Sequence, residues 1–354
     1  MPVNELMPPE SVVRLDDPQS GLRGFIVLHS TALGPAAGGC RLWRYADEAA
    51  ASEDALRLAA GMTMKNALAG LPLGGGKAVL MLPDAPFSRP RLFAAFGRAV
   101  AALGGRYVTA EDVGTDVDDM ALVAQETAHV AGRPRQGDRP GGDPSPWTAR
   151  GVFGAMELAV QRRLGRSLAD VTVAVQGVGH VGMALCALLH AAGARLVIAE
   201  ARSDLAARAA TRFGADLVSS RAIASVRADV FAPCAMGGVL NVASAAALQA
   251  KVVCGAANNQ LSVPEIGDML ADRGILYAPD YVVNAGGIVN VAAEYFGWPQ
   301  ADVATRVDGI VARLGEVLDL ADARGVAPGT AASLLAQRIL AGVNATTGKT
   351  MLAA

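Results

Sequence analysis

Apolar residues recur along this chain at two spacings, the continuous or alternating pattern of strands and the three-to-four-residue period of helices. In the first third of the chain, segments with the strand pattern alternate with segments that have the helix pattern. Strands are expected at residues 24–29, 77–82 and 106–110, and helices at residues 46–69 and 91–103. This succession predicts an α/β domain over residues 1–135.

A second α/β region follows a break rich in glycine, proline and charge at residues 132–146. Beyond the break, strands and helices alternate at the spacing of a parallel, doubly wound sheet. Helices are expected at 147–163, from 180, at 203–213 and at 300–342, and strands at 171–176, 195–199, 229–232, 252–254 and 275–277. The sequence thus predicts two α/β domains, the second with a Rossmann-type sheet over residues 136–330. A helix at 330–354 is free to pack back on the first domain.

The composition favours a compact protein. Hydrophobic residues make up 52% and charged residues 18% of the 354 positions, which suits two buried cores and argues against disorder. A formal net charge of −2 provides no basic field for nucleic acid. The four cysteines are widely spaced, which predicts reduced thiols and no metal site. Neither a secretory signal nor a membrane-spanning stretch is recognised, so we expect a cytoplasmic location.

A dinucleotide fingerprint follows the expected strand at 171–176. Gly177, Gly179 and Gly182 form the G-x-G-x-x-G pattern, in which glycines permit a tight turn and the following helix N-terminus stabilises a pyrophosphate. Between and beside these glycines lie the other expected contacts of the cofactor, Val178, His180 and Val181. Glu200 ends the next strand, where its carboxylate can bind ribose hydroxyls and repel a 2′-phosphate. NAD is therefore favoured, although Arg202 nearby leaves NADP open.

A chemical site is indicated by two lysines and one carboxylate. Lys77 follows three glycines within an apolar run, and Lys65 lies near the end of a helical run. Burial disfavours a charged ammonium, which suits Lys77 to proton transfer. Asp112 follows a strand, at the sheet edge where α/β folds bind ligands. The alternatives are surface lysines and a solvated acid; a phosphate-binding loop is disfavoured because Ala78 follows the lysine.

These residues lie within blocks that resemble the Glu/Leu/Phe/Val dehydrogenase family, closest to the leucine, valine and phenylalanine dehydrogenases. One block reads Leu-Gly-Gly-Gly-Lys-Ala-Val. The blocks are residues 33–39, 64–70, 73–79, 107–115, 144–149, 231–235, 254–261 and 277–287. The resemblance covers residues 22–300. It implies a homo-oligomer, dimer or octamer, with an active-site cleft between an N-terminal α/β substrate domain and the Rossmann-type domain.

The resemblance also implies a reaction, the reversible oxidative deamination of an L-amino acid by NAD to the 2-oxo acid, ammonia and NADH. By resemblance, Lys65 binds the substrate carboxylate with help from the Gly38 and Gly39 backbone. Lys77 polarises the carbonyl through a water and acts as acid and base, while Asp112 transfers protons to and from the amine.

The remaining implied positions border the cofactor and the substrate side chain. Asn258 or Asn259 would hold the amine or the nicotinamide, and Thr148, Ala235, Met236 and Asn284 would border the cofactor. The side-chain pocket would be formed by Ala37, Met62, Ala110, Ile288 and Val291. These walls carry no charge, so a hydrophobic amino acid is expected. Apolar pockets discriminate weakly, by ~1–3 kcal/mol per methylene, which leaves branched aliphatic and aromatic side chains open.

Two other classes of protein compete with this interpretation. A 2-hydroxy-acid type of NAD dehydrogenase would need an arginine and a histidine–carboxylate pair in place of the two lysines. A catalytically silent NAD-binding sensor would have no need of Lys65, Lys77 and Asp112 together.

Overall fold

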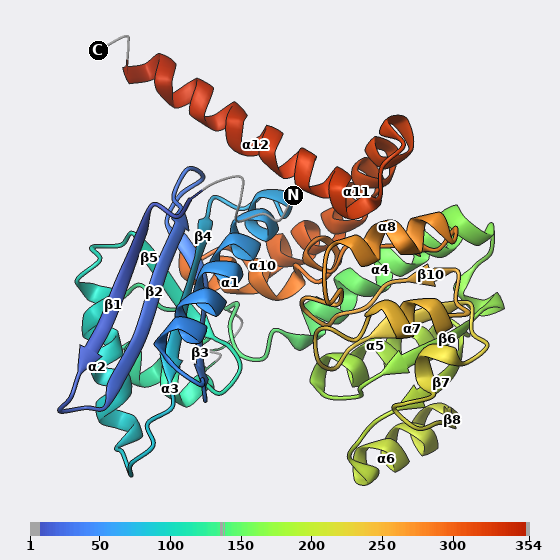
Figure 1. Ribbon diagram of the computed structural model, residues 1–354, viewed down its shortest axis with the longest axis horizontal. Helices are drawn as coiled ribbons and strands as arrows, with labels where there is room; N and C mark the ends of the chain where they lie inside the picture. Colours follow the sequence, from blue (N-terminus) through green and yellow to red (C-terminus); the bar gives the residue numbers. More distant parts are fainter. Residues whose placement is uncertain (1–7, 135–136, 138, 352–354) are drawn as a thin grey trace. The chain divides into compact units, whose positions relative to one another are not determined.

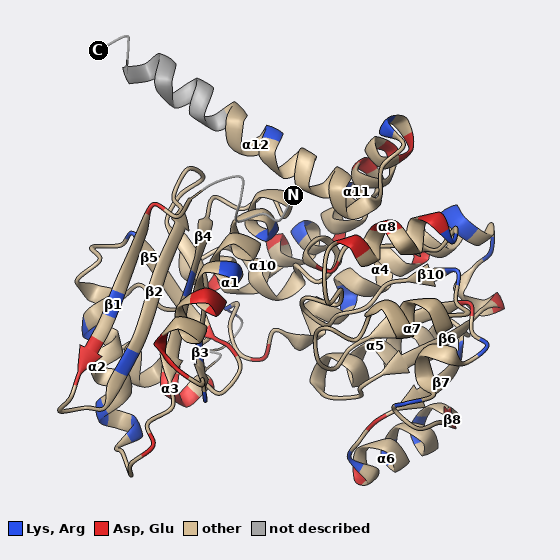
Figure 2. Ribbon diagram, in the orientation of Figure 1, with Lys and Arg blue, Asp and Glu red and all other residues tan. Residues whose placement is uncertain are grey.

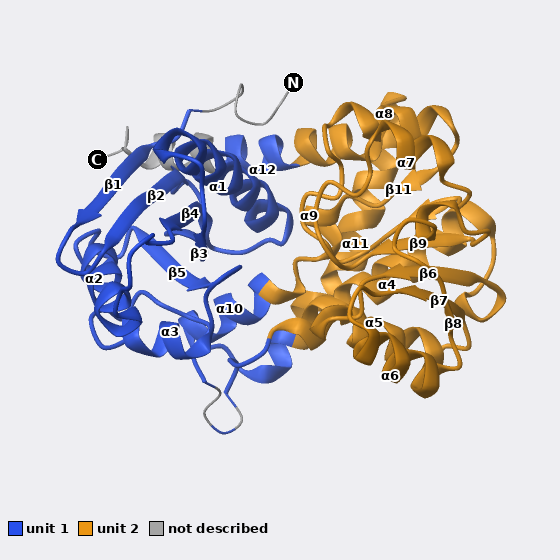
Figure 3. Cartoon of the chain, turned by 60° about the horizontal axis from the view of Figure 1, so that its bottom comes forward, with its two compact units in different colours: residues 1–143, 288–303, 336–354 blue, residues 144–287, 304–335 orange. Residues whose placement is uncertain are grey.

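The computed structural model describes residues 8–134, 137 and 139–351, which divide with the rest of the chain into two compact units (Figure 3). Unit 1 consists of residues 1–143, 288–303 and 336–354, and unit 2 of residues 144–287 and 304–335. Both units are α/β, as predicted. The division is discontinuous, because residues 288–303 and 336–354 group with unit 1. The sequence left the last helix free to return to the first domain but placed residues 288–303 in the second.

Unit 1 is built on a mixed five-stranded sheet of order β1-β2-β4-β3-β5 (Figure 1). β2 pairs antiparallel with β1 and β4, whereas β3 pairs parallel with β4 and β5. The strands are β1 (Ser11–Asp17), β2 (Leu22–Ser30), β3 (Ala36–Trp43), β4 (Gly74–Met81) and β5 (Tyr107–Glu111). The sequence patterns missed β1 and β3.

Helices cover both faces of this sheet. Alanines of α1 (Glu48–Leu68) pack on Val27 and Val79 at one face. At the other face lie α2 (Arg89–Ala101) and α3 (Val117–Val123), which share an apolar core with the strands. The sheet is therefore buried on both sides, and a polar group placed on it needs a partner.

Unit 2 contains a parallel six-stranded sheet of order β11-β10-β9-β6-β7-β8. The strand order reverses between β6 and β9, so the carboxyl ends of these two strands define the switch point at which such sheets bind ligands. The strands are β6 (Thr172–Gln176), β7 (Arg195–Ala199), β8 (Asp216–Leu217), β9 (Val230–Pro233), β10 (Val252–Val253) and β11 (Leu276–Tyr277).

The helices of unit 2 also form two layers. A core shared with the sheet lies beneath α7 and α8, and α4 packs beside α5. The helices are α4 (Ser145–Leu164), α5 (His180–Ala191), α6 (Ser203–Phe213), α7 (Val242–Ala247), α8 (Glu265–Asp272) and α9 (Asp280–Val283). Acidic and basic residues are interspersed over both units (Figure 2).

The last helices differ from the expected pattern. α10 (Gly286–Phe296), which the periodicity did not reveal, carries residues 288–296 into unit 1. The single helix expected over residues 300–342 is two helices, α11 (Gln300–Arg324) and α12 (Pro328–Met351). Gly325 follows α11 with a φ of +62°, a left-handed conformation that ends a helix and favours glycine.

Contact between α1 and β4 depends on a glycine. A Cβ at Gly75 would lie 2.1 Å from the backbone nitrogen of Thr63, so Gly75→Ala must push α1 off the sheet. We expect it to lower the free energy of unfolding by about 3 kcal/mol. Gly61→Ala, in the same helix with open space around its Cβ, should instead raise it by about 0.5–1 kcal/mol. Denaturant unfolding of both variants checks this, and equal effects would contradict it.

Candidate functional site

Lys77 and Asp112 meet inside unit 1. The lysine Nζ lies 2.7 Å from Oδ2 of Asp112, and the two side chains are only 7% and 17% exposed. Lys77 lies within β4, and Asp112 is the first residue after β5. The two groups singled out from the sequence are thus an ion pair in a nearly closed environment.

Two glycines of β3 create the space for this pair. A Cβ at Gly38 would lie 1.9 Å from the carbonyl oxygen of Gly76, and a Cβ at Gly39 would lie 2.8 Å from Cβ of Asp112. Any other residue would separate the strands or expel the carboxylate. The hydroxyl of Tyr107 donates to the Gly38 carbonyl at 2.7 Å and ties β5 to β3 at this point.

Arg41, two positions along β3, contacts the same carboxylate. Its Nε lies 3.2 Å from Oδ2 of Asp112, and its Nη1 lies 3.0 Å from Oδ2 of Asp54. Burial alone would raise the pKa of Asp112, but Lys77 and Arg41 together lower that pKa to about 2. Asp112 is therefore an anion at neutral pH.

The loop after β5 is held by its own hydrogen bonds. The Asp112 amide donates to the Thr115 hydroxyl at 2.9 Å, and that hydroxyl donates to the Cys40 carbonyl at 2.8 Å. Gly114 has a φ of +82°, and a Cβ there would lie 1.9 Å from the Leu42 carbonyl. The backbone of the loop thus lies directly against β3, which fixes the position of Asp112.

The other substrate residues predicted for the first domain also belong to unit 1. Lys65 lies in the last turn of α1, and Met62 lies one turn earlier, with its Cγ 3.2 Å from the position of a Cβ at Gly38. Ala37 and Ala110 are buried on β3 and β5. Ile288 and Val291 stand three residues apart on α10 and are half-buried. Their roles remain predictions.

α10 is attached to unit 1 through Glu294. This carboxylate, 6% exposed, accepts hydrogen bonds from the Gly132 and Arg133 amides at 2.8 and 3.2 Å and from the Arg133 Nε at 2.9 Å. Gly132 in turn lies against Ala110, with 3.8 Å between that side chain and the position of a Cβ at Gly132. The helix bearing Ile288 and Val291 is therefore fixed beside the end of β5.

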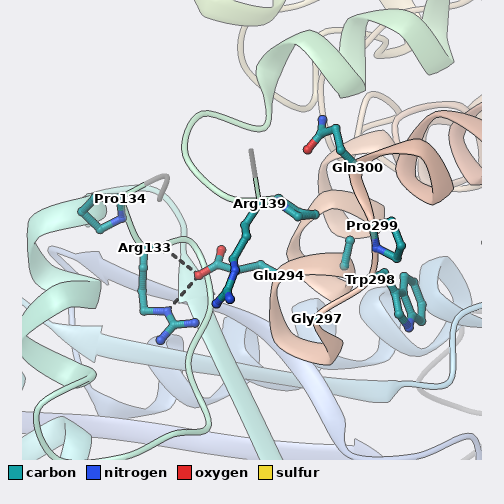
Figure 4. A pocket seen from close by; sticks show the side chains of 10 residues that line it. Arg133, Pro134, Arg139, Glu294, Gly297, Trp298, Pro299 and Gln300 are labelled. Carbon is teal, nitrogen blue, oxygen red and sulfur yellow. Dashed lines mark hydrogen bonds and ion pairs between the residues drawn. The ribbon is translucent and has the colours of Figure 1, made fainter. Parts of the chain in front are cut away.

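A cavity of about 440 Å³ opens beside this attachment, with Arg139 next to the Glu294 carboxylate (Figure 4). It is lined by Arg133, Pro134, Arg139, Pro140, Ala293, Glu294, Gly297, Trp298, Pro299 and Gln300. None of the site residues predicted from the sequence lines it.

The glycine fingerprint in unit 2 forms the expected turn between β6 and α5. Gly177 has a φ of +92°, and a Cβ at Gly182 would lie 2.1 Å from the Gly177 carbonyl. Gly179 is the N-cap of α5, whose first turn contains His180, Val181 and Gly182. Only glycine allows so close a turn at a helix N-terminus, so the chain here fits a dinucleotide pyrophosphate.

Glu200 lies at the end of β7 beside this turn. Its carboxylate accepts hydrogen bonds from the amides of Val178 and Arg202 at 2.8 and 3.0 Å. Burial would raise the pKa of Glu200, but these amides lower it, so the acid is charged at the end of β7. The Arg202 side chain is 63% exposed, with its Nε 3.6 Å from Glu200.

The predicted asparagines gather at the carboxyl ends of the unit 2 strands. Asn284 donates to Asn258 Oδ1 at 2.8 Å, and the Asn259 amide donates to Asp280 Oδ2. Asn258, predicted to contact substrate, therefore lies in unit 2, and its role remains a prediction. Asn259 has a φ of +52°, unusual for a residue other than glycine.

The remaining predicted cofactor positions also lie in unit 2. Ala235 lies next to Gly177, at 2.7 Å from the position of a Cβ there, while Met236 is 71% exposed. Thr148, in α4, lies 2.9 Å from the position of a Cβ at Gly287. Beside them, burial raises the pKa of the Cys234 thiol to about 11, which suits a packing residue.

Sequence reasoning overlooked Arg41 and Asp54. The signal was present, because Arg41 is an arginine in an apolar and glycine-rich stretch, two residues after Gly39. On a strand this spacing places both residues on one face. The strand β3 was not predicted because its glycines interrupt the apolar pattern that identifies a strand.

Comparison with known proteins shows the family. Residues 9–129 match the dimerisation domain of the Glu/Leu/Phe/Val dehydrogenases, and residues 198–348 match the Glutamate/Leucine/Phenylalanine/Valine dehydrogenase model. The chain belongs to this family and is an amino-acid dehydrogenase. No helix in the described part of the chain combines the length and apolar character needed to cross a membrane.

Individual relatives align over nearly their full length. A leucine dehydrogenase of Thermoactinomyces intermedius is 46% identical over 93% of this chain and 90% of its own. A valine dehydrogenase of Streptomyces albus is also 46% identical, over 94% and 92%. The crystal structure of L-tryptophan dehydrogenase from Nostoc punctiforme superposes with a TM-score of 0.83 at 38% identity, over 96% of this chain and 98% of the other.

The ion pair of Asp112 makes stability depend on pH. Because its folded pKa of about 2 lies below the ordinary value of 3.8, the pair stabilises the fold above pH 5, by on the order of 2 kcal/mol, and loses this contribution as the pH falls toward 2. Asp112→Asn should be less stable than the parent at pH 6, with the difference reduced by about 1 kcal/mol at pH 3. Denaturant unfolding measures both values.

The exposed acid Asp84, paired with Arg44 at the surface, offers a matched control. Asp84→Asn should leave the difference from the parent constant across the same pH range, because solvent screens an exposed pair. A constant difference for Asp112→Asn as well would contradict the assignment.

Proposed function

We propose that the protein oxidatively deaminates a hydrophobic L-amino acid with NAD, in a reversible reaction. Amino acid, NAD and water give the 2-oxo acid, ammonium, NADH and a proton. The observation that carries the proposal is the buried contact between Lys77 and Asp112 beside the Gly38–Gly39 backbone, in a member of an amino-acid dehydrogenase family.

In this mechanism the three predicted charged groups of unit 1 have separate tasks. Lys65 holds the substrate carboxylate, an anion that needs a fixed cation. Lys77, as a neutral amine, removes a proton from the water that adds to the imine carbon and returns it in the reverse direction. Asp112, an anion at neutral pH, takes a proton from the substrate ammonium before the hydride leaves Cα and returns it to the amine as ammonia departs.

The dinucleotide would be held by unit 2. The turn at Gly177–Gly182 would bind the pyrophosphate and Glu200 the adenosine ribose. When bound, the nicotinamide supplies the hydride acceptor for the substrate Cα, a chemistry that no side chain of the chain provides. The proposed reaction requires the two units to act on one substrate. NAD is preferred because a charged Glu200 repels a 2′-phosphate.

The substrate side chain would lie against apolar walls. Ala37, Ala110 and Val291 present small or branched aliphatic groups, which suits leucine, valine or an aromatic residue and disfavours glutamate. The relatives act, by their names, on leucine, valine and tryptophan. A homo-oligomer is proposed as well, since a dimerisation-domain model matches residues 9–129.

NADH formation at 340 nm across L-leucine, L-valine, L-phenylalanine, L-tryptophan and L-glutamate tests the reaction. We expect turnover with a hydrophobic substrate and none with glutamate. Lys77→Ala should lower kcat at least ~100-fold, because it removes the general base. Activity on a 2-hydroxy acid without ammonia dependence in the reverse direction would favour the other dehydrogenase class. Dinucleotide binding without any turnover would favour the sensor.

Cofactor choice is tested by replacing Glu200. Parent protein should bind NAD more tightly than NADP in calorimetric titrations, which do not depend on turnover. Glu200→Ser removes the charge that repels the 2′-phosphate and should improve NADP binding about tenfold or more relative to NAD. Arg202→Ala serves as the matched control and should not improve it. Tighter NADP binding by the parent would overturn the NAD assignment.

A further inference from the structure

Arg41 contacts Asp112, but the proposed proton-transfer steps give it no role. Its guanidinium and the Lys77 ammonium reach the same oxygen, Oδ2 of Asp112, at 3.2 and 2.7 Å. Two cations therefore share one carboxylate oxygen inside unit 1. Surface ion pairs commonly fluctuate, but here the Arg41 and Asp112 side chains are only 19% and 17% exposed.

A second carboxylate fixes the far side of the guanidinium. Arg41 Nη1 contacts Oδ2 of Asp54 at 3.0 Å, and the Tyr45 hydroxyl donates to that oxygen at 2.6 Å. Arg57 contacts the other oxygen of Asp54 at 2.7 Å, from a side chain that is 51% exposed. The charged groups thus form a row from Lys77 through Asp112 and Arg41 to Asp54.

The two cations on Asp112 differ in chemistry. A guanidinium stays protonated at any pH at which the protein is folded, whereas a lysine ammonium can lose its proton. A carboxylate that faced Lys77 alone would hold the ammonium tightly and oppose that loss. With Arg41 on the same oxygen, the negative charge is shared, and the permanent positive charge of Arg41 repels the ammonium.

We infer that Arg41 is a positioning residue for proton transfer, which keeps Asp112 an anion while weakening its hold on the Lys77 ammonium, so that Lys77 can release its proton. The catalytic meaning of this inference rests on the proposed function. The effect of Arg41 on the contact between Lys77 and Asp112 lies within unit 1 and can be tested without substrate or cofactor.

Other charged or titratable groups on the elements around β4 must be considered. Cys40 lies beside Arg41 on β3, where burial raises its thiol pKa well above the ordinary value, so it is neutral. His29 lies on β2, with Nδ1 2.8 Å from the Thr63 hydroxyl, and Lys65 lies on α1. These groups are unchanged in the variants below, so they contribute equally to each measurement.

The direct measurement is competitive acetylation. Trace acetic anhydride labels only neutral amines, and peptide mass spectrometry reports the pH at which Lys77 is half-labelled, with no substrate or cofactor present. Arg41→Gln should move this midpoint up by about one pH unit, because it removes a cation and strengthens the attraction of the Asp112 carboxylate for the Lys77 ammonium. Arg41→Lys, which restores the charge, should return it toward the parent value.

Asp54→Asn supplies a test of opposite sign. It removes an anion that neutralises Arg41, so the Lys77 midpoint should move down. Both variants lose buried contacts, and a merely structural role for Arg41 predicts no shift or shifts in one direction. Arg57→Gln, which loses an exposed contact to the same Asp54, is the matched control and should leave the midpoint near that of the parent.

Activity gives the second readout. If the protein deaminates an amino acid as proposed, the acid limb of kcat/KM should move up by the same pH interval in Arg41→Gln, so that activity falls about tenfold below that limb and recovers above it. A uniform loss at every pH, with an unmoved labelling midpoint, would overturn the inference. Labelling shifts of the expected signs in a protein with no deaminating activity would sustain the electrostatic link and reject only the proposed function.

Discussion

A charge can be buried in a folded protein only where a countercharge meets it, and unit 1 is arranged around this requirement. Lys77 projects from a strand that is covered on both faces, so Asp112 must reach it from the end of β5. This approach is possible because β3, lying between them, carries no side chain at Gly38 or Gly39. Without side chains at these two positions of β3, the Asp112 carboxylate can contact the Lys77 side chain.

Unit 2 meets a different requirement with the same residue type. Around Gly177 and Gly182 the glycines bring one backbone segment against another at the start of α5. Here the ligand would supply the negative charge that the helix N-terminus favours. In unit 1 glycine makes room for a side-chain pair, whereas in unit 2 it would make room for the proposed cofactor.

The sequence predicted the strongly periodic elements and the motifs that lie at their ends. The strand at β6, the helix α5 and the acid at Glu200 follow one another closely along the chain, so local patterns were enough to find them. β3 was missed because glycines weaken the apolar alternation that identifies a strand. α10 was missed because it begins with two glycines, Gly286 and Gly287, within a region of short elements. Arg41 and Asp54 lie 13 positions apart and meet only through folding, so no local pattern could join them.

The attachment of Glu294 to Gly132 and Arg133 has a consequence for how the protein is made. A ribosome releases the first 143 residues long before α10, with the main segment of unit 2 in between. The Gly132 and Arg133 amides and the Arg133 guanidinium can therefore bind the Glu294 carboxylate only after more than 150 further residues have been synthesised. Most of unit 2 has been synthesised before the chain of unit 1 is complete. Unit 1 therefore leaves the ribosome first but completes its fold only after most of unit 2 has been made.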